Sequence, residues 1–116
     1  MGSGPQSELS DALAKLWVRF LPEMLERVRV LDSAGCALEA GTLDEGARAA
    51  AGEAAHKLAG ALGTFGLPEG TALAREAEQF YASRSAAEAA SIKRMREIAR
   101  ELEALVRTHK AISLAE

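Results

Sequence analysis

The chain has 116 residues, of which 48% are hydrophobic and 27% charged, values typical of one soluble globular domain. The net charge of −3 argues against a nucleic-acid partner, and the apolar runs are too short to span a membrane. The single cysteine, Cys36, excludes an internal disulfide and fits a reducing compartment, so we expect a cytoplasmic protein.

The first predicted helix covers roughly residues 7–40, within a chain whose many alanines and 4% aromatic content favour helices over strands. Its apolar stripe consists of Leu9, Leu13, Leu16, Phe20, Met24, Val28, Leu31 and Leu38. We expect Pro22 to kink or split this helix, because proline removes a backbone hydrogen bond, and Gly41 to end it. Residues 1–6 are interpreted as a flexible leader and residues 7–116 as one domain.

The second predicted helix begins at Thr42, which has capping-box spacing with Glu45. Its apolar stripe consists of Leu43, Ala47, Ala50, Ala54, Leu58, Leu62 and Phe65. Gly66 and Pro68 predict a break after it, since glycine favours a helix end and proline favours the first turn of a new helix.

The third predicted helix begins at Pro68 and ends near Ser83, and a second capping-box pattern, Ser85 and Glu88, precedes the fourth. The apolar positions are Leu73, Ala77 and Phe80 on the third helix, and Met95, Ile98, Leu102, Leu105 and Ile112 on the fourth. Short connections between long amphipathic helices predict an all-α, antiparallel up-down four-helix bundle. We expect it to be a monomer.

His56 lies in an unusual setting on the second predicted helix. The residues four before it and three, four and seven after it, which share its face, are Gly52, Ala59, Gly60 and Gly63. Glycine inside a helix costs about 1 kcal/mol relative to alanine, so this strip weakens the helix without local benefit. It predicts an exposed histidine that a partner can approach closely, since His56 also lies off the apolar stripe.

An exposed imidazole near neutral pH is a competent nucleophile once one ring nitrogen is held as a donor. Glu78, on the next predicted helix, is a candidate for holding it. Two alternatives remain: His56 is an ordinary surface residue, or the small-residue strip docks a partner helix without any chemistry at His56. His109 falls on the stripe of the fourth helix and is interpreted as structural. Two distant histidines without Cys–His or Glu–His spacing predict no metal site.

The run from Ala55 to Gly66, AHKLAGALGTFG, resembles the signature of the histidine phosphotransfer family. That signature has a phosphorylatable histidine, an apolar residue two positions later, and glycines four, seven and ten positions later, all matched here. The end of the run is similar to chemotaxis-kinase phosphotransfer domains, and the segment from Leu67 to Glu78 resembles the next helix of the family.

The resemblance implies that His56 accepts and donates a phosphoryl group through Nε2. It also implies that Glu78 hydrogen-bonds the other ring nitrogen and that Gly60 and Gly63 leave room for a docking partner. The expected partners are a histidine kinase and response-regulator receiver domains. With no ATP site of its own and no cofactor, the domain is expected to be a phosphocarrier rather than an autonomous enzyme.

One departure from the family pattern concerns the charge that meets the phosphate. Many members carry lysine three residues after the histidine, where this chain has Ala59. Lys57 and Arg75 are the candidate substitutes, but Lys57 is rotated by about 100° from His56 around the helix.

Overall fold

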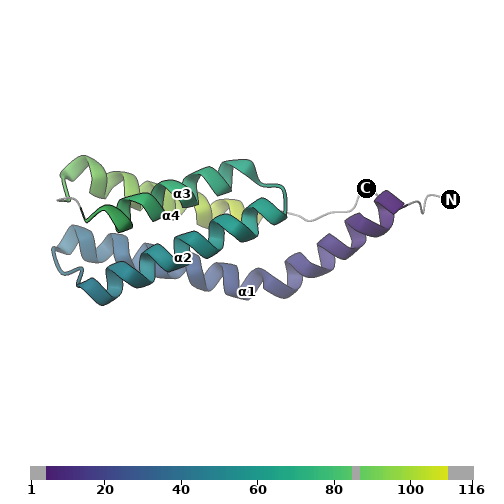
Figure 1. Ribbon diagram of the computed structural model, residues 1–116, viewed down its shortest axis with the longest axis horizontal. Helices are drawn as coiled ribbons and strands as arrows, with labels where there is room; N and C mark the ends of the chain where they lie inside the picture. The colour runs from purple at the N-terminus through teal and green to yellow at the C-terminus, as the bar shows by residue number, and fades with distance from the viewer. Residues whose placement is uncertain (1–4, 85–86, 110–116) are drawn as a thin grey trace.

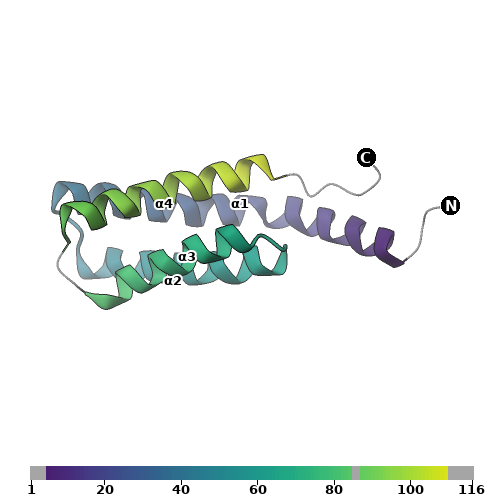
Figure 2. The same cartoon turned by 90° about the horizontal axis from the view of Figure 1, so that it is seen from above.

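The computed structural model describes residues 5–84 and 87–109, and in them it contains four α-helices and no strand. The helices are α1 (Pro5–Ala40), α2 (Glu45–Thr64), α3 (Pro68–Ser83) and α4 (Ala89–Thr108). Each helix packs on the next, and α4 closes the bundle against α1 (Figures 1 and 2). The predicted all-α up-down bundle is therefore confirmed. Among the described helices, none is long and apolar enough to cross a membrane.

Helix α1 is one unbroken helix that contains Pro22, so the predicted split does not occur, although the helix is bent along its length (Figure 1). Its first turns extend beyond the other helices (Figure 2). The predicted stripe is buried from Met24 onwards, but Leu9, Leu16 and Phe20 are exposed. The prediction was wrong there for two reasons. Leu9 lies in the turns that extend beyond the other helices, and near Leu16 and Phe20 it is the buried Trp17 that faces the bundle.

The connection between α1 and α2 differs from the predicted capping box. Gly41 ends α1 in a left-handed conformation, with φ +72°, as its position predicted. The backbone N–H of Thr42 then donates to the carbonyl of Ala37 at 2.8 Å, so Thr42 belongs to the end of α1. Asp44 caps α2 instead, because its Oδ1 accepts from the N–H of Ala47 at 2.7 Å.

The break predicted at Gly66 and Pro68 is a tight turn between α2 and α3. Gly66 has φ +74°, and the N–H of Leu67 donates to the carbonyl of Leu62 at 2.9 Å. This six-to-one bond, beside the bond from Gly66 to the Gly63 carbonyl at 3.1 Å, forms a Schellman motif. Pro68 opens α3, where its missing N–H costs nothing. The two helices therefore run back along each other from this turn.

Helices α2 and α3 meet through small residues. The contact face of α2 contains the buried Ala51, Ala55 and Ala59, whereas Ala50, which was predicted on the apolar stripe, is exposed. A Cβ atom added to Gly70 of α3 would lie 2.8 Å from Leu62 Cδ1, closer than real Cβ contacts come. The two backbones can therefore approach closely, which allows polar side chains at the edge of this interface to touch.

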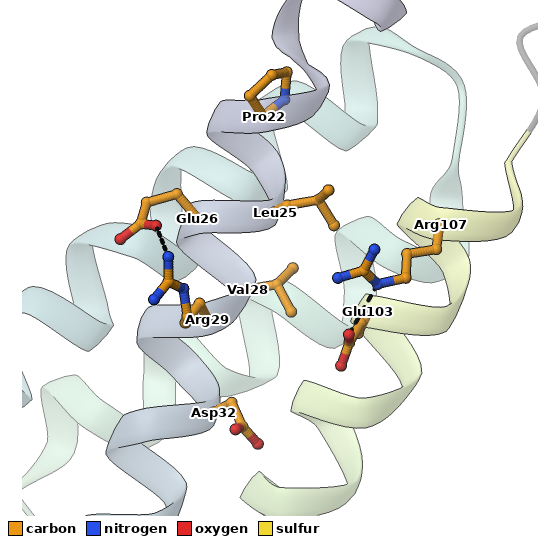
Figure 3. Close-up of a pocket in the computed structure, with 8 residues that line it drawn as sticks. All are labelled: Pro22, Leu25, Glu26, Val28, Arg29, Asp32, Glu103 and Arg107. Atoms are coloured by element: carbon orange, nitrogen blue, oxygen red, sulfur yellow. Dashed lines mark hydrogen bonds and ion pairs between the residues drawn. The ribbon is translucent and has the colours of Figure 1, made fainter.

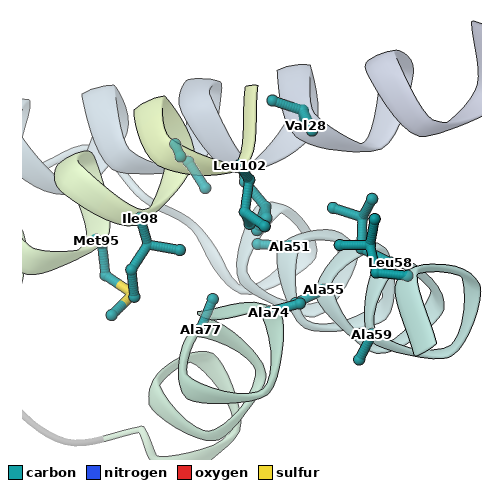
Figure 4. Close-up of a cluster of buried hydrophobic side chains, with 14 of the residues drawn as sticks. Val28, Ala51, Ala55, Leu58, Ala59, Ala74, Ala77, Met95, Ile98 and Leu102 are labelled. Carbon is teal, nitrogen blue, oxygen red and sulfur yellow. The ribbon is translucent and has the colours of Figure 1, made fainter. Parts of the chain in front are cut away.

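The core is formed by side chains from all four helices, including Val28, Leu58, Ala74 and Leu102 (Figure 4). Among the described residues, no polar or charged side chain is buried in it. Of the predicted positions on α4, Met95, Ile98 and Leu102 are buried and Leu105 is half-buried. Hydrophobic burial is accordingly the main source of stability.

Two sequence predictions for the last helix fall partly or wholly on residues outside the described part of the chain. Ile112 lies there, and so does Ser85, the first residue of the second predicted capping box. Its other member, Glu88, directly precedes α4 and makes no side-chain capping bond.

An aromatic cluster around Trp17 lies at the end of the bundle where α2 and α4 terminate. The indole packs edge-on against Phe65, with ring centroids 5.0 Å apart, and against His109 at 4.3 Å. His109 is partly buried there, and the burial lowers its pKa from the ordinary value of 6.5 because the charged ring is less well solvated. His109 is therefore a packing residue, as predicted, although it directly follows the end of α4 in an extended conformation and does not lie on the helical stripe.

This contact predicts a pH-dependent signal from Trp17, the only tryptophan. Between pH 6.5 and the lower pKa of folded His109, the unfolded chain binds more protons, so stability falls as pH falls through this window. We expect Trp17 fluorescence to be quenched with a midpoint below 6.5, because an imidazolium against indole quenches its emission. The transition should disappear in His109→Gln and persist in His56→Gln. A transition lost only in His56→Gln would contradict the assignment.

Candidate functional site

His56 stands on the surface of α2 beside α3. Its side chain is 69% exposed, and its Nδ1 lies 2.9 Å from Oε2 of Glu78, whose side chain is 31% exposed. A carboxylate only accepts hydrogen bonds, so Nδ1 is the protonated nitrogen in this pair. The other nitrogen, Nε2, then carries a lone pair on an exposed ring, which is the arrangement that a nucleophilic imidazole requires.

The short distance between His56 and Glu78 follows from the way α2 and α3 pack. Buried alanines on both helices, Ala55 and Ala59 on α2 with Ala74 and Ala77 on α3, hold the backbones close together. His56 lies ten residues before Gly66 and Glu78 twelve after it, so antiparallel helices bring them to similar heights above the turn. Neither side chain has to extend far to reach the other.

Among the small residues that surround His56 on α2, only Gly60 faces open space. A Cβ atom added at Gly60 meets nothing within 4 Å, whereas one added at Gly63 lies 3.6 Å from Thr71 Oγ1. At Gly52 the nearest atom is Tyr81 Cβ at 3.9 Å. Ala59 is 2% exposed and belongs to the interface with α3, so its predicted place on the open strip was wrong. The open surface next to His56 is centred on Gly60.

The two candidate cations differ in their surroundings. Lys57 Nζ lies 3.3 Å from Glu53 Oε2, an ion pair along the outer surface of α2. Arg75 is exposed on α3, three residues before Glu78, and makes no ion pair with another residue in the described ranges. Lys57 therefore has a carboxylate partner on its own helix, whereas the guanidinium of Arg75 makes no ion pair in the described residues.

A hollow of about 370 Å³ lies between α1 and α4 (Figure 3). Four of its charged side chains form two ion pairs, Arg29 with Glu26 at 3.0 Å and Arg107 with Glu103 at 2.9 Å. These residues belong to the helix pair that does not carry His56, and they gather no nucleophile. Within residues 5–84 and 87–109, no group of three or more His, Cys, Asp or Glu side chains could hold a metal ion.

Thr71 is a residue near the site that the sequence did not single out. Its hydroxyl lies 3.4 Å from the carbonyl of Ala59 and 3.2 Å from that of Leu67, which joins the start of α3 to the histidine helix. Its position seven residues before Glu78 was the available signal, because residues seven apart share one face of a helix.

Fold and site together define a helical-bundle protein that presents a carboxylate-oriented histidine to solvent. The family model described as Hpt domain matches residues 15–111, which is most of the chain. The chain therefore belongs to the Hpt domain family, and histidine phosphotransfer in phosphorelays, with kinases and receiver domains, is the activity of that family. Comparison with curated proteins and with solved structures returned no match.

Proposed function

We propose that this chain carries a phosphoryl group on Nε2 of His56 and exchanges it with response-regulator receiver domains and, through them, a histidine kinase. The observation that carries the proposal is the 2.9 Å contact between Nδ1 of His56 and Glu78 on an otherwise exposed ring. It supports a single tautomer, with the free lone pair directed to the side from which a partner can approach.

The proposed step conserves atoms and charge within the two partners. The Nε2 lone pair attacks the phosphorus of an aspartyl phosphate, the Nε2–P bond forms, and the P–O bond to the receiver breaks. The electron pair of that bond goes to the receiver carboxylate. The ring keeps its proton on Nδ1 and gains positive charge, which faces the carboxylate of Glu78. The reverse sequence returns the phosphoryl group.

The open surface of α2 indicates which chemical groups the receiver and the kinase supply. The surface centred on Gly60 leaves space beside His56, so a receiver can bring its own acidic pocket and bound Mg²⁺ to the phosphorus. ATP is consumed by the kinase, which makes this chain a phosphocarrier in the cytoplasm. We expect it to work as a monomer, because one helix pair holds both His56 and Glu78.

Transfer from a purified phosphorylated receiver to the domain is the experiment that tests this function. We expect acid-labile, base-stable label on the domain, and return of that label to unphosphorylated receiver. The competing function, docking of a partner helix without phosphate chemistry, would give a receiver complex without label. Absence of label from a panel of receivers and from phosphoramidate, with the domain folded, would contradict the proposal.

Glu78→Gln tests the orienting role of the carboxylate. An amide can still accept a hydrogen bond but does not offset the positive charge that develops on the ring, so we expect transfer to slow by about three- to tenfold, with label still forming. In Glu78→Ala the preference for the Nδ1–H tautomer should also weaken, which ¹⁵N shifts of the imidazole report. Glu69→Gln, at an exposed carboxylate in the first turn of α3 that makes no ion pair in the described residues, is the matched control. Unchanged rate and tautomer in both Glu78 variants would contradict the role.

A further inference from the structure

Two rows of residues face each other across the α2–α3 interface. On α2 the row is His56, Gly60 and Gly63, and on α3 it is Thr71, Arg75 and Glu78, with the same spacing of four and then three residues. Residues at this spacing share one face of a helix. Because α2 and α3 are antiparallel, the order of one row runs opposite to that of the other.

The ends of the two rows are fixed by contacts. Glu78 Oε2 lies 2.9 Å from His56 Nδ1 at one end. At the other end, a Cβ atom at Gly63 would lie 3.6 Å from Thr71 Oγ1. The middle members, Gly60 and Arg75, must therefore lie opposite each other. Arg75 is only three residues from Glu78, about 4.5 Å along the helix axis at 1.5 Å per residue.

From this juxtaposition we infer that Arg75 supplies the positive charge that contacts the phosphoryl group on His56, an inference that rests on the proposed function. Gly60 has no side chain, and open space lies above it, so the arginine can extend toward His56 without obstruction. Its guanidinium makes no ion pair with Glu78 or with any other residue in the described part of the chain.

The neighbouring groups on α2 do not offer this charge. Ala59, which stands where many family members carry lysine, is buried and uncharged. Lys57 is paired with Glu53 and projects from a different side of α2. A phosphoryl group on Nε2 would bring about two negative charges to the surface, and guanidinium matches phosphate oxygens with paired N–H donors.

The test compares phosphorylation by phosphoramidate, a small donor that needs no docking surface, in the wild type and in Arg75→Ala, Arg75→Lys and Arg75→Glu. We expect Arg75→Ala to slow labelling about three- to tenfold, Arg75→Glu to slow it further, and Arg75→Lys to restore part of the rate. The salt dependence of the rate should also weaken in Arg75→Ala. Arg100→Glu, an exposed charge reversal on α4, is the matched control and should label like the wild type.

A second readout observes the arginine directly. The side-chain Nε–H signal of Arg75 is assigned in ¹H–¹⁵N spectra as the signal that is present in the wild type and missing from Arg75→Lys. We expect this signal to shift when His56 of the wild type is phosphorylated. The inference would be overturned if the Arg75 variants were labelled at the rate of Arg100→Glu and the Arg75 Nε–H signal of the wild type did not shift on phosphorylation. The proposed function would still stand in that case. Label that persists in His56→Gln would overturn the proposed function itself, whatever the Arg75 variants do.

Discussion

His56→Gln is expected to eliminate phosphorylation, by receivers and by phosphoramidate alike, while the protein stays folded. Glutamine has no ring nitrogen with a free lone pair, so the Nε2–P bond cannot form. The side chain is 69% exposed, and surface substitutions of this kind change the free energy of unfolding by less than about 0.5 kcal/mol. Thermal unfolding and incorporation of label, measured on the same preparation, separate the two effects.

His109→Gln is the control for this prediction, because His109 is the other histidine of the chain. Its ring packs against Trp17 at the far end of the bundle, so its loss should cost stability but leave the label intact. Full label in His56→Gln, or loss of label in a folded His109→Gln, would show that the wrong histidine has been assigned.

Gly60→Arg is expected to block exchange with receivers while improving the stability of α2. A Cβ at this position meets nothing within 4 Å, and arginine is a better helix former than glycine by roughly 0.5–1 kcal/mol. The long side chain then fills the space that a receiver needs. A steric block at the centre of an interface costs about 2 kcal/mol or more, which corresponds to roughly a 30-fold loss of transfer or greater.

Two comparisons separate docking from chemistry in this variant. Phosphoramidate is small, so its reaction with His56 should change far less than receiver transfer in Gly60→Arg. Ala50→Arg places the same side chain on an exposed position of α2, about 120° around the helix from His56, and should leave receiver transfer unchanged. Equal rates of receiver transfer in the wild type, Gly60→Arg and Ala50→Arg would contradict the docking surface.

The periodicity of apolar residues was enough to predict four helices, because each helix buries one face, and the short connections predicted that neighbouring helices run antiparallel. It could not show how far the helices overlap. Leu9, Leu16 and Phe20 continue the stripe of α1 correctly in spacing, yet Leu9 is exposed because α1 extends beyond its neighbours. Leu16 and Phe20 are exposed because the buried Trp17 takes the position that faces the bundle. Spacing likewise favoured Thr42 as the cap of α2, but its backbone bond to Ala37 completes the end of α1 and leaves Asp44 as the cap.

Some residues of the candidate site could be placed by counting positions along the chain, and others could not. Counting residues from Gly66 was sufficient to place Glu78 near the height of His56, since α2 ends and α3 begins at one tight turn. The burial of Ala59 could not be predicted from the sequence, because alanine suits an exposed helix surface and a close helix interface equally well. The choice between Lys57 and Arg75 required side-chain positions: only the structure shows that Lys57 is paired with Glu53.

The most direct test of the central claim is the ³¹P–¹⁵N coupling of the phosphorylated domain, prepared with ¹⁵N-labelled histidine. One phosphorus signal coupled to Nε2 of His56, with Nδ1 still protonated and hydrogen-bonded to Glu78, is the result expected from the 2.9 Å contact. Coupling to Nδ1 of His56, or to either ring nitrogen of His109, would contradict it.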